Sequence, residues 1–125
     1  ADDPYVQERF GEFWLRVQAA QALADLAGQQ LDTALARGPS LTADERGEVA
    51  VAGAQAKVLA HRAALDVGTG LFDVTGASST AARHGYDRFW RNARVHTLHD
   101  PVAYKIRDLG RYALLDQIPE PTAYS

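Results

Sequence analysis

The chain has 125 residues, of which 46% are hydrophobic and 23% are charged, a size and balance with which one globular domain can bury a core. It contains no cysteine, which excludes a disulfide scaffold, a cysteine nucleophile and a thiolate metal site. Any redox chemistry would therefore require a bound cofactor.

No apolar run approaches the roughly 18 to 20 residues that cross a bilayer, and the first residues are acidic where a secretory signal would be basic. We therefore expect a cytoplasmic protein without membrane contact. The chain also lacks methionine. We therefore expect that Ala1 is not a natural start, and that it results either from processing of the terminus or from a cut within a longer protein.

The net charge of −3 conceals an uneven distribution. Residues 81–112 contain seven Lys or Arg against three Asp, a local charge of +4, and the remainder carries −7. Such a basic segment is either a solvated, internally paired face or a site for an anionic group. A pI near 5.7 makes nucleic acid a poor candidate, and we expect no nucleic-acid partner.

The first predicted helix spans Pro4 to Arg37. Its apolar residues recur at steps of three or four, on one stripe: Val6, Phe10, Phe13, Val17, Ala20, Ala24, Ala27, Leu31 and Leu35. Proline suits the first helical turn, and Gly38 followed by Pro39 supplies the stop.

A second helix is predicted from about Ala43 to Val74. Thr42 and Glu45 have the spacing of a capping box, in which the two residues satisfy each other's free amides. The apolar stripe is rich in small residues, which let a neighbouring helix approach closely: Val49, Ala52, Ala56, Leu59, Ala63, Val67, Gly70 and Leu71. Two such long helices joined by a short turn must lie antiparallel.

A third helical region is predicted from about Ser79 to Leu98, with Gly85 as a point where it can split. After a break at Asp100 and Pro101, a last helix runs from Val102 to Leu115. No strand-like alternation of length appears. The sequence thus predicts an all-α, antiparallel (up-and-down) four-helix bundle over residues 1–118, followed by an extended tail over 119–125.

The densest group of reactive side chains comprises Arg91, Arg94, His96, His99 and Asp100. His96 and His99 are three apart, a spacing that a metal pair can use on one helix face. No second Glu/His pair completes such a site, so we predict no metal. A histidine near a helix end can instead be a charged or capping residue, or a general acid or base, and these alternatives stay open.

Two further features have competing interpretations. The turn from Thr75 to Thr80 either caps the following helix with its hydroxyls or uses amides and hydroxyls to bind phosphate. His61, among small apolar residues of the second helix, is interpreted as an exposed or core-edge residue. The aromatic residues are interpreted as core or interface anchors.

Two runs resemble a known family: Val-Thr-Gly-Ala-Ser-Ser-Thr at 74–80, and Phe-Trp-Arg-Asn-Ala-Arg-Val-His-Thr-Leu-His-Asp-Pro-Val-Ala-Tyr at 89–104. They are similar to the C-terminal helical domain of the acyl-CoA dehydrogenase superfamily. Within it they resemble the dibenzothiophene monooxygenase-like branch of reduced-flavin-dependent oxygenases. The resemblance covers essentially the whole chain, but its specificity lies in about thirty residues.

The resemblance implies a bundle that packs on an N-terminal helical domain and a middle β-domain, with a flavin between them and a neighbouring subunit in contact, as in a homotetramer. It implies flavin-binding roles for Thr75, Gly76, Ala77 and Ser78 and, from the basic run, for Arg91, Arg94 and His96. In family dehydrogenases the matching turn is glycine-rich and holds the dinucleotide part of FAD. Only Gly76 remains here, which leaves both FMN and FAD open.

The resemblance also implies catalytic roles for His99 and Asp100. Family dehydrogenases carry their carboxylate base on a Tyr-Glu-Gly-Thr segment that aligns with residues 99–102, so Asp100 is one methylene shorter than that base. A displaced base loses much of its advantage. In the monooxygenase branch, the histidine matching His99 lies near the flavin and assists its reaction with oxygen.

Together these features predict the flavin-site and oligomerisation domain of a flavoprotein oxidoreductase that uses reduced flavin and O₂ to oxidise a small organic or organosulfur substrate. A separate flavin reductase is then an expected partner. One alternative is a true acyl-CoA dehydrogenase acting on CH–CH bonds with an electron-transfer flavoprotein as acceptor. Another is a non-catalytic helical assembly module.

Overall fold

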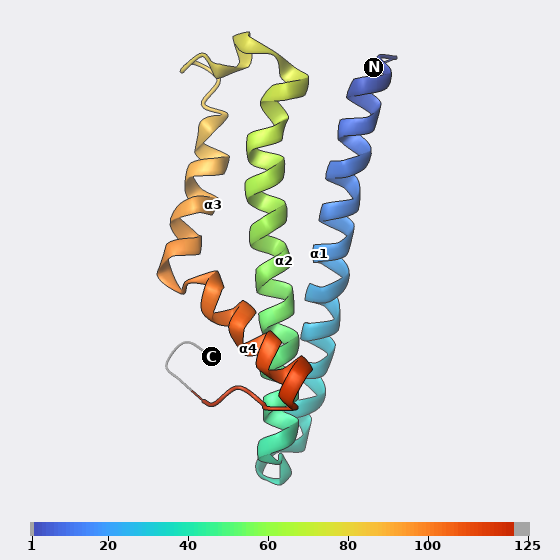
Figure 1. Ribbon diagram of the computed structural model, residues 1–125, viewed down its shortest axis with the longest axis vertical. Coiled ribbons are helices and arrows are strands. Elements are labelled where there is room, and N and C mark those ends of the chain that lie inside the picture. The colour runs from blue at the N-terminus through green and yellow to red at the C-terminus, as the bar shows by residue number, and fades with distance from the viewer. Residues whose placement is uncertain (1, 122–125) are drawn as a thin grey trace.

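The computed structural model describes residues 2–121, which form four α-helices and no strand. The helices are α1 (Pro4–Arg37), α2 (Ala43–Thr75), α3 (Asp87–His99) and α4 (Val102–Leu115). Figure 1 shows α1 and α3 on opposite sides of α2, each antiparallel to it, and α4 crossing the half of α2 near the α1–α2 turn. The predicted all-α antiparallel four-helix architecture is confirmed.

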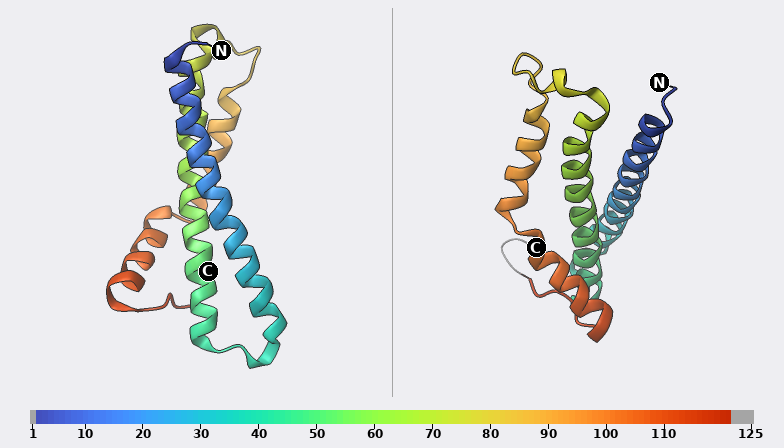
Figure 2. Two further views of the ribbon diagram at one scale, coloured as in Figure 1. Left: turned by 90° about the vertical axis from the view of Figure 1, so that its right-hand side faces the viewer. Right: turned by 45° about the horizontal axis from the view of Figure 1, so that its top comes forward.

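Helix α2 is the centre of the arrangement because it makes the main contacts with each of the other three helices. The left view in Figure 2 shows α4 projecting to one side of the layer formed by α1, α2 and α3. The outer faces of α1 and α3 therefore have none of the described helices packed against them.

The ends of the two long helices follow from their capping residues. The Asp3 side chain accepts a hydrogen bond of 2.9 Å from the Tyr5 amide, and Gly38 takes a positive φ of 53° where α1 stops. At the start of α2, the Thr42 hydroxyl accepts from the Glu45 amide at 3.1 Å. The Glu45 carboxylate in turn accepts from the Thr42 amide at 3.3 Å, so the predicted capping box is confirmed.

The third helical region begins later than predicted. Residues Ala77–Thr80 form a short 3-10 helix, residues 81–86 form turns, and α3 starts only at Asp87. The predicted start near Ser79 is wrong because Gly76 and Gly85 adopt positive φ values of 79° and 62°, which no helical residue has. The short 3-10 helix ends at Thr80, and Gly85 lies two residues before α3, near the point where the sequence allowed a split.

The buried core lies on α1 and α2 and consists mostly of small side chains: Phe13, Ala20, Val51, Ala52, Ala54, Val58 and Ala63. Gly70 allows the close approach, because a Cβ there would lie 2.7 Å from Phe13 Cε1. Ion pairs reinforce the contact at its edge. Arg9 bonds Asp73 at 2.8 Å, and Arg16 bonds Asp66 at 3.2 Å.

Helix α4 and the segment after it are fixed to the start of α2. The Tyr112 hydroxyl lies 2.8 and 2.9 Å from the two Glu48 carboxylate oxygens. Ile118 packs on Gly47, where an added Cβ would lie 2.5 Å from the Cβ of Ile118. Of the predicted extended tail, residues 119–121 are non-helical, and 122–125 lie outside the described residues.

None of the described helices combines the length and hydropathy that a membrane span requires.

Candidate functional site

A carboxylate between two lysines lies where α3 gives way to α4. The chain has two lysines, Lys57 on α2 and Lys105 on α4, and both face Asp100. Lys57 Nζ forms a short ion pair with Asp100 Oδ2, and Lys105 Nζ lies 3.7 Å from the same oxygen. The hydrogen bond from Lys57 lowers the pKa of Asp100, with Lys105 adding to the effect and burial opposing it. Asp100 is therefore held as a carboxylate that ties three helices together.

One turn along, a pair of histidines joins α2 to α3. His61 Nε2 and His96 Nδ1 are 3.0 Å apart, with the rings edge to face. Desolvation lowers the pKa of His61, the nearby His96 and Lys57 lower it further, and Asp100 opposes them. A neutral ring has one donor and one acceptor nitrogen. Because His61 Nδ1 is buried without a partner, its contact with His96 is the one that fixes this ring.

The other predicted residues of α3 face solvent. His99 is exposed at the end of the helix and bonds to no described residue. The exposed Arg91 guanidinium pairs with Asp87 of its own helix at 2.5 Å. Arg94 donates to the Thr97 hydroxyl at 2.5 Å. Because a guanidinium carries five N–H donors, both arginines keep donors available for an anion.

The turn after α2 uses part of its hydrogen-bonding capacity internally. The Thr75 hydroxyl lies 2.9 Å from the Leu71 carbonyl and 2.8 Å from the Ser79 hydroxyl, and Ser79 donates to the Gly76 carbonyl at 2.6 Å. Ala77 and Ser78 are exposed. The hydroxyls of Thr75 and Ser79 thus stabilise the turn, and Ser78 is the exposed hydroxyl beside them.

The predicted residues form two groups that are far apart within one chain. Fifteen residues separate His61 from Gly76 on α2, which is about 20 Å at the helical rise. The turn of Thr75–Ser78 therefore lies at one end of α3, and His96, His99 and Asp100 lie at the other (Figure 1). The two groups do not converge on one small ligand in a single chain.

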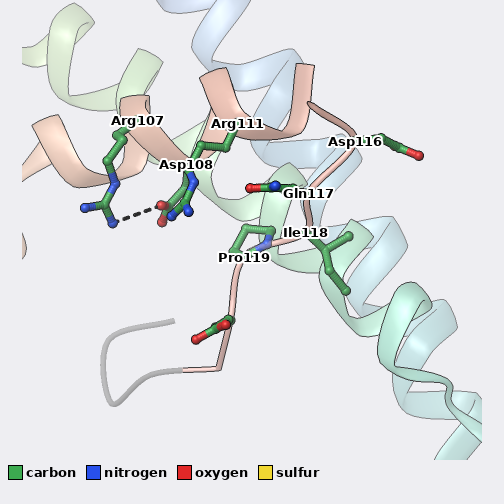
Figure 3. Close-up of a pocket in the computed structure, with 8 residues that line it drawn as sticks. Arg107, Asp108, Arg111, Asp116, Gln117, Ile118 and Pro119 are labelled. Carbon is green, nitrogen blue, oxygen red and sulfur yellow. Dashed lines mark hydrogen bonds and ion pairs between the residues drawn. The ribbon is translucent and has the colours of Figure 1, made fainter. Parts of the chain in front are cut away.

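Two clefts flank α4. One of about 320 Å³ runs between α2 and α4 and is lined by Lys57, Asp100 and Lys105 together with small apolar residues. The other, of about 660 Å³, lies between α4 and the segment after it. Figure 3 shows Arg107, which lines this second cleft, reaching Asp108 at 3.2 Å. None of the predicted site residues lines the second cleft.

The sequence analysis did not single out Lys57, and it interpreted His61 as an exposed or core-edge residue. Their four-residue spacing places them on one face of α2. The same spacing separates His96 on α3 from Asp100, the C-cap of that helix. That repeated spacing is a signal, but it becomes informative only when the register of α2 against α3 is known. Within residues 2–121, no group of three or more His, Cys, Asp or Glu side chains could hold a metal ion.

Comparison with known proteins identifies the relatives of this chain. A family model described as "Acyl-CoA dehydrogenase, C-terminal domain" matches residues 1–103. The chain is 50% identical to the Pseudomonas putida protein named "Probable FMNH2-dependent monooxygenase SfnC", over 100% of this chain and 32% of that protein. The chain therefore spans about a third of the length of this relative.

Solved structures give the same relationship. Methanesulfinate monooxygenase MsuC from Pseudomonas fluorescens superposes with a TM-score of 0.96 at 49% identity, over 99% of this chain and 32% of MsuC. The dibenzothiophene monooxygenase TdsC from Paenibacillus sp. A11-2, in complex with FMN and indole, superposes with a TM-score of 0.93 at 42% identity. That match covers 99% of this chain and 32% of TdsC.

Proposed function

The chain belongs to the family of acyl-CoA dehydrogenase C-terminal domains, and from this premise we propose that it is the flavin-site and oligomerisation domain of a reduced-flavin-dependent monooxygenase. The observation that carries the choice is the environment of Asp100. A carboxylate paired with two lysines, with a lowered pKa, is a poor base for removing the α-proton of an acyl-CoA. The names of the relatives, which are monooxygenases, also favour this function over a dehydrogenase.

The chemistry of the available donors fits a flavin with one phosphate. The exposed guanidinium groups of Arg91 and Arg94 suit the fork geometry of a phosphate. We assign these arginines and His96 to FMN binding, and favour FMN over FAD because the turn with Gly76 lacks the glycine-rich character of a dinucleotide site. When bound, the reduced flavin supplies two electrons, so that one atom of O₂ enters the substrate and the other leaves as water.

Within this site, His99 is assigned the proton transfer. Its ring is exposed at the end of α3, one residue before the fixed carboxylate of Asp100, and histidine is the side chain most often used as a general acid or base. Asp100 acts by holding the α3–α4 corner in place. His99 thereby gives or takes a proton at a ring nitrogen on the open side of the helix.

The turn of Thr75, Gly76, Ala77 and Ser78 is assigned to the flavin site of a neighbouring subunit, because it lies about 20 Å along α2 from His61. This assignment requires an oligomer, which we take to be a homotetramer. We place the protein in the cytoplasm, with a separate flavin reductase as its partner. The substrate class that we propose is a small organosulfur compound.

The test uses the full-length protein with reduced FMN, isotopically labelled O₂, and either methanesulfinate or dibenzothiophene. We expect one labelled oxygen atom in the product, and loss of product formation in the His99→Ala variant with FMN binding retained. His84→Ala, in the loop of residues 81–86, is the matched control. Light scattering of the same sample tests the tetramer.

Each alternative has its own result. Bleaching of the oxidised flavin by an acyl-CoA under anaerobic conditions, without oxygen incorporation, would establish a dehydrogenase. Absence of flavin binding by the full-length protein would establish an assembly module. Labelled product from His99→Ala at the wild-type rate would remove His99 from the mechanism but leave the monooxygenase.

A further inference from the structure

Two residues of α2 hold the end of α3 at two successive points. Lys57 and His61 are four residues apart and share a face of α2. His96 lies in the last turn of α3, four residues before the C-cap Asp100. Lys57 pairs with Asp100, and His61 bonds His96 at 3.0 Å. His99 lies between the two held residues and is itself exposed.

We propose that Lys57 and His61 are positioning residues, which present His99 to the flavin by fixing Asp100 and His96 on either side of it. The inference rests on the proposed function, because His99 has a reacting role only if that function holds. Neither Lys57 nor His61 need touch the flavin or the substrate.

The burial of the contact between Lys57 and Asp100 supports a positioning role. The side chains of Lys57 and Asp100 are 21% and 19% exposed, so their pairing is shielded from water and fixes geometry better than a surface pair does. At Asp100 the backbone leaves the helix, with φ −142° and ψ 96°. Without Lys57, this corner would keep only the longer contact of Asp100 with Lys105, at 3.7 Å.

The experiment compares four variants of the full-length protein. Lys57→Met removes the charge and keeps the stem, Lys57→Arg restores a cation, and His61→Phe keeps a ring without nitrogens. Arg62→Met is the matched control, since Arg62 is an exposed cation of α2 that pairs with no described residue. Hydrogen exchange of residues 95–103 in the flavin-free protein reports on the position of the corner, and methanesulfinate turnover with reduced FMN reports on its consequence.

We expect faster exchange at 95–103 in Lys57→Met and His61→Phe, with kcat lowered roughly 10-fold to 100-fold, the effect of a small misplacement of a reacting group. Lys57→Arg should recover most of the kcat, and Arg62→Met should match the wild type in both measurements. A general loss of stability would instead lower the thermal midpoint without rescue by arginine.

The inference is overturned if the wild type is active and Lys57→Met and His61→Phe both leave the hydrogen exchange at 95–103 unchanged. It is also overturned if both variants leave kcat unchanged. A wild-type protein that incorporates no oxygen refutes the proposed function itself. The two failures are thus distinguishable.

Discussion

At the scale of single residues, His61 makes the stability of the protein depend on pH. Desolvation and the neighbouring His96 and Lys57 lower its pKa below the ordinary 6.5, against the opposing effect of Asp100. Below pH 6.5 the unfolded chain therefore binds a proton that the folded chain does not. Stability should fall as the pH drops from 6.5 towards the lowered pKa, and should not change through this group at higher pH.

His61→Phe should flatten that dependence. The measurement is the thermal midpoint of the full-length protein from about pH 8 to about pH 5, a window set by the histidine titration. Asp100 does not interfere, because its pKa is lowered from 3.8 and its contribution is lost only at more acidic pH. The variant His84→Gln serves as control, and an equal slope in wild type and His61→Phe would contradict the assignment.

The lysine pairing of Asp100 also leads to a prediction about chemistry. Asp100→Glu restores the longer carboxylate of the family dehydrogenases, yet it should not create dehydrogenase activity, because Lys57 and Lys105 remain to hold the new carboxylate. Anaerobic addition of an acyl-CoA should leave the absorbance of the oxidised flavin unchanged. Bleaching in Asp100→Glu, with none in Asp100→Asn, would show that side-chain length alone had separated the two activities.

At the scale of helices, substitution by alanine should have opposite effects on stability at two glycines of α2, Gly70 and Gly53. A Cβ on Gly70 would lie 2.7 and 2.8 Å from two ring atoms of Phe13, whereas a Cβ on Gly53 meets nothing within 4 Å. Gly70→Ala should therefore destabilise the protein by about 1–3 kcal/mol through overpacking. Gly53→Ala should stabilise it by up to about 1 kcal/mol through helix propensity. Urea unfolding that gives both variants the same sign would contradict the packing of α1 on α2.

The helix boundaries could be predicted because they depend on nearby residues. Thr42 and Glu45 form their capping box within four residues, and Gly38 ends α1 in a single turn. The start of α3 could not be predicted to the residue, because the hydroxyls before Gly85 are compatible with either a helical cap or a turn. The sequence could name part of the candidate site for the same physical reason. His96, His99 and Asp100 lie close together in sequence. His61 and His96 are 35 residues apart in sequence, and their contact depends on how α2 packs against α3, which no short motif encodes.

At the scale of the whole molecule, much of the apolar surface has nothing packed on it. Trp14 and Leu15 are each 66% exposed on α1, and Leu114 is 85% exposed on α4. With α2 at the centre and α4 to one side (Figure 2), the described residues 2–121 contain no further helix that covers the outer faces. Exposed apolar surface of this extent is typical of an interface, and the proposed oligomer, with the remainder of the longer relatives' architecture, would cover it.

The 125 residues alone should therefore self-associate at micromolar concentration. Burying a few large apolar side chains contributes about 1.5–3 kcal/mol each, and about 8 kcal/mol corresponds to micromolar affinity. Trp14→Glu should weaken the association by placing a charge on the apolar face of α1. Gln29→Glu adds the same charge at an exposed polar position of that helix and should have little effect. Sedimentation velocity over a tenfold or larger range of concentration distinguishes the two. If the wild-type chain stays monomeric over the whole concentration range, its exposed apolar faces do not drive association. The oligomer would then have to form through contacts outside this domain.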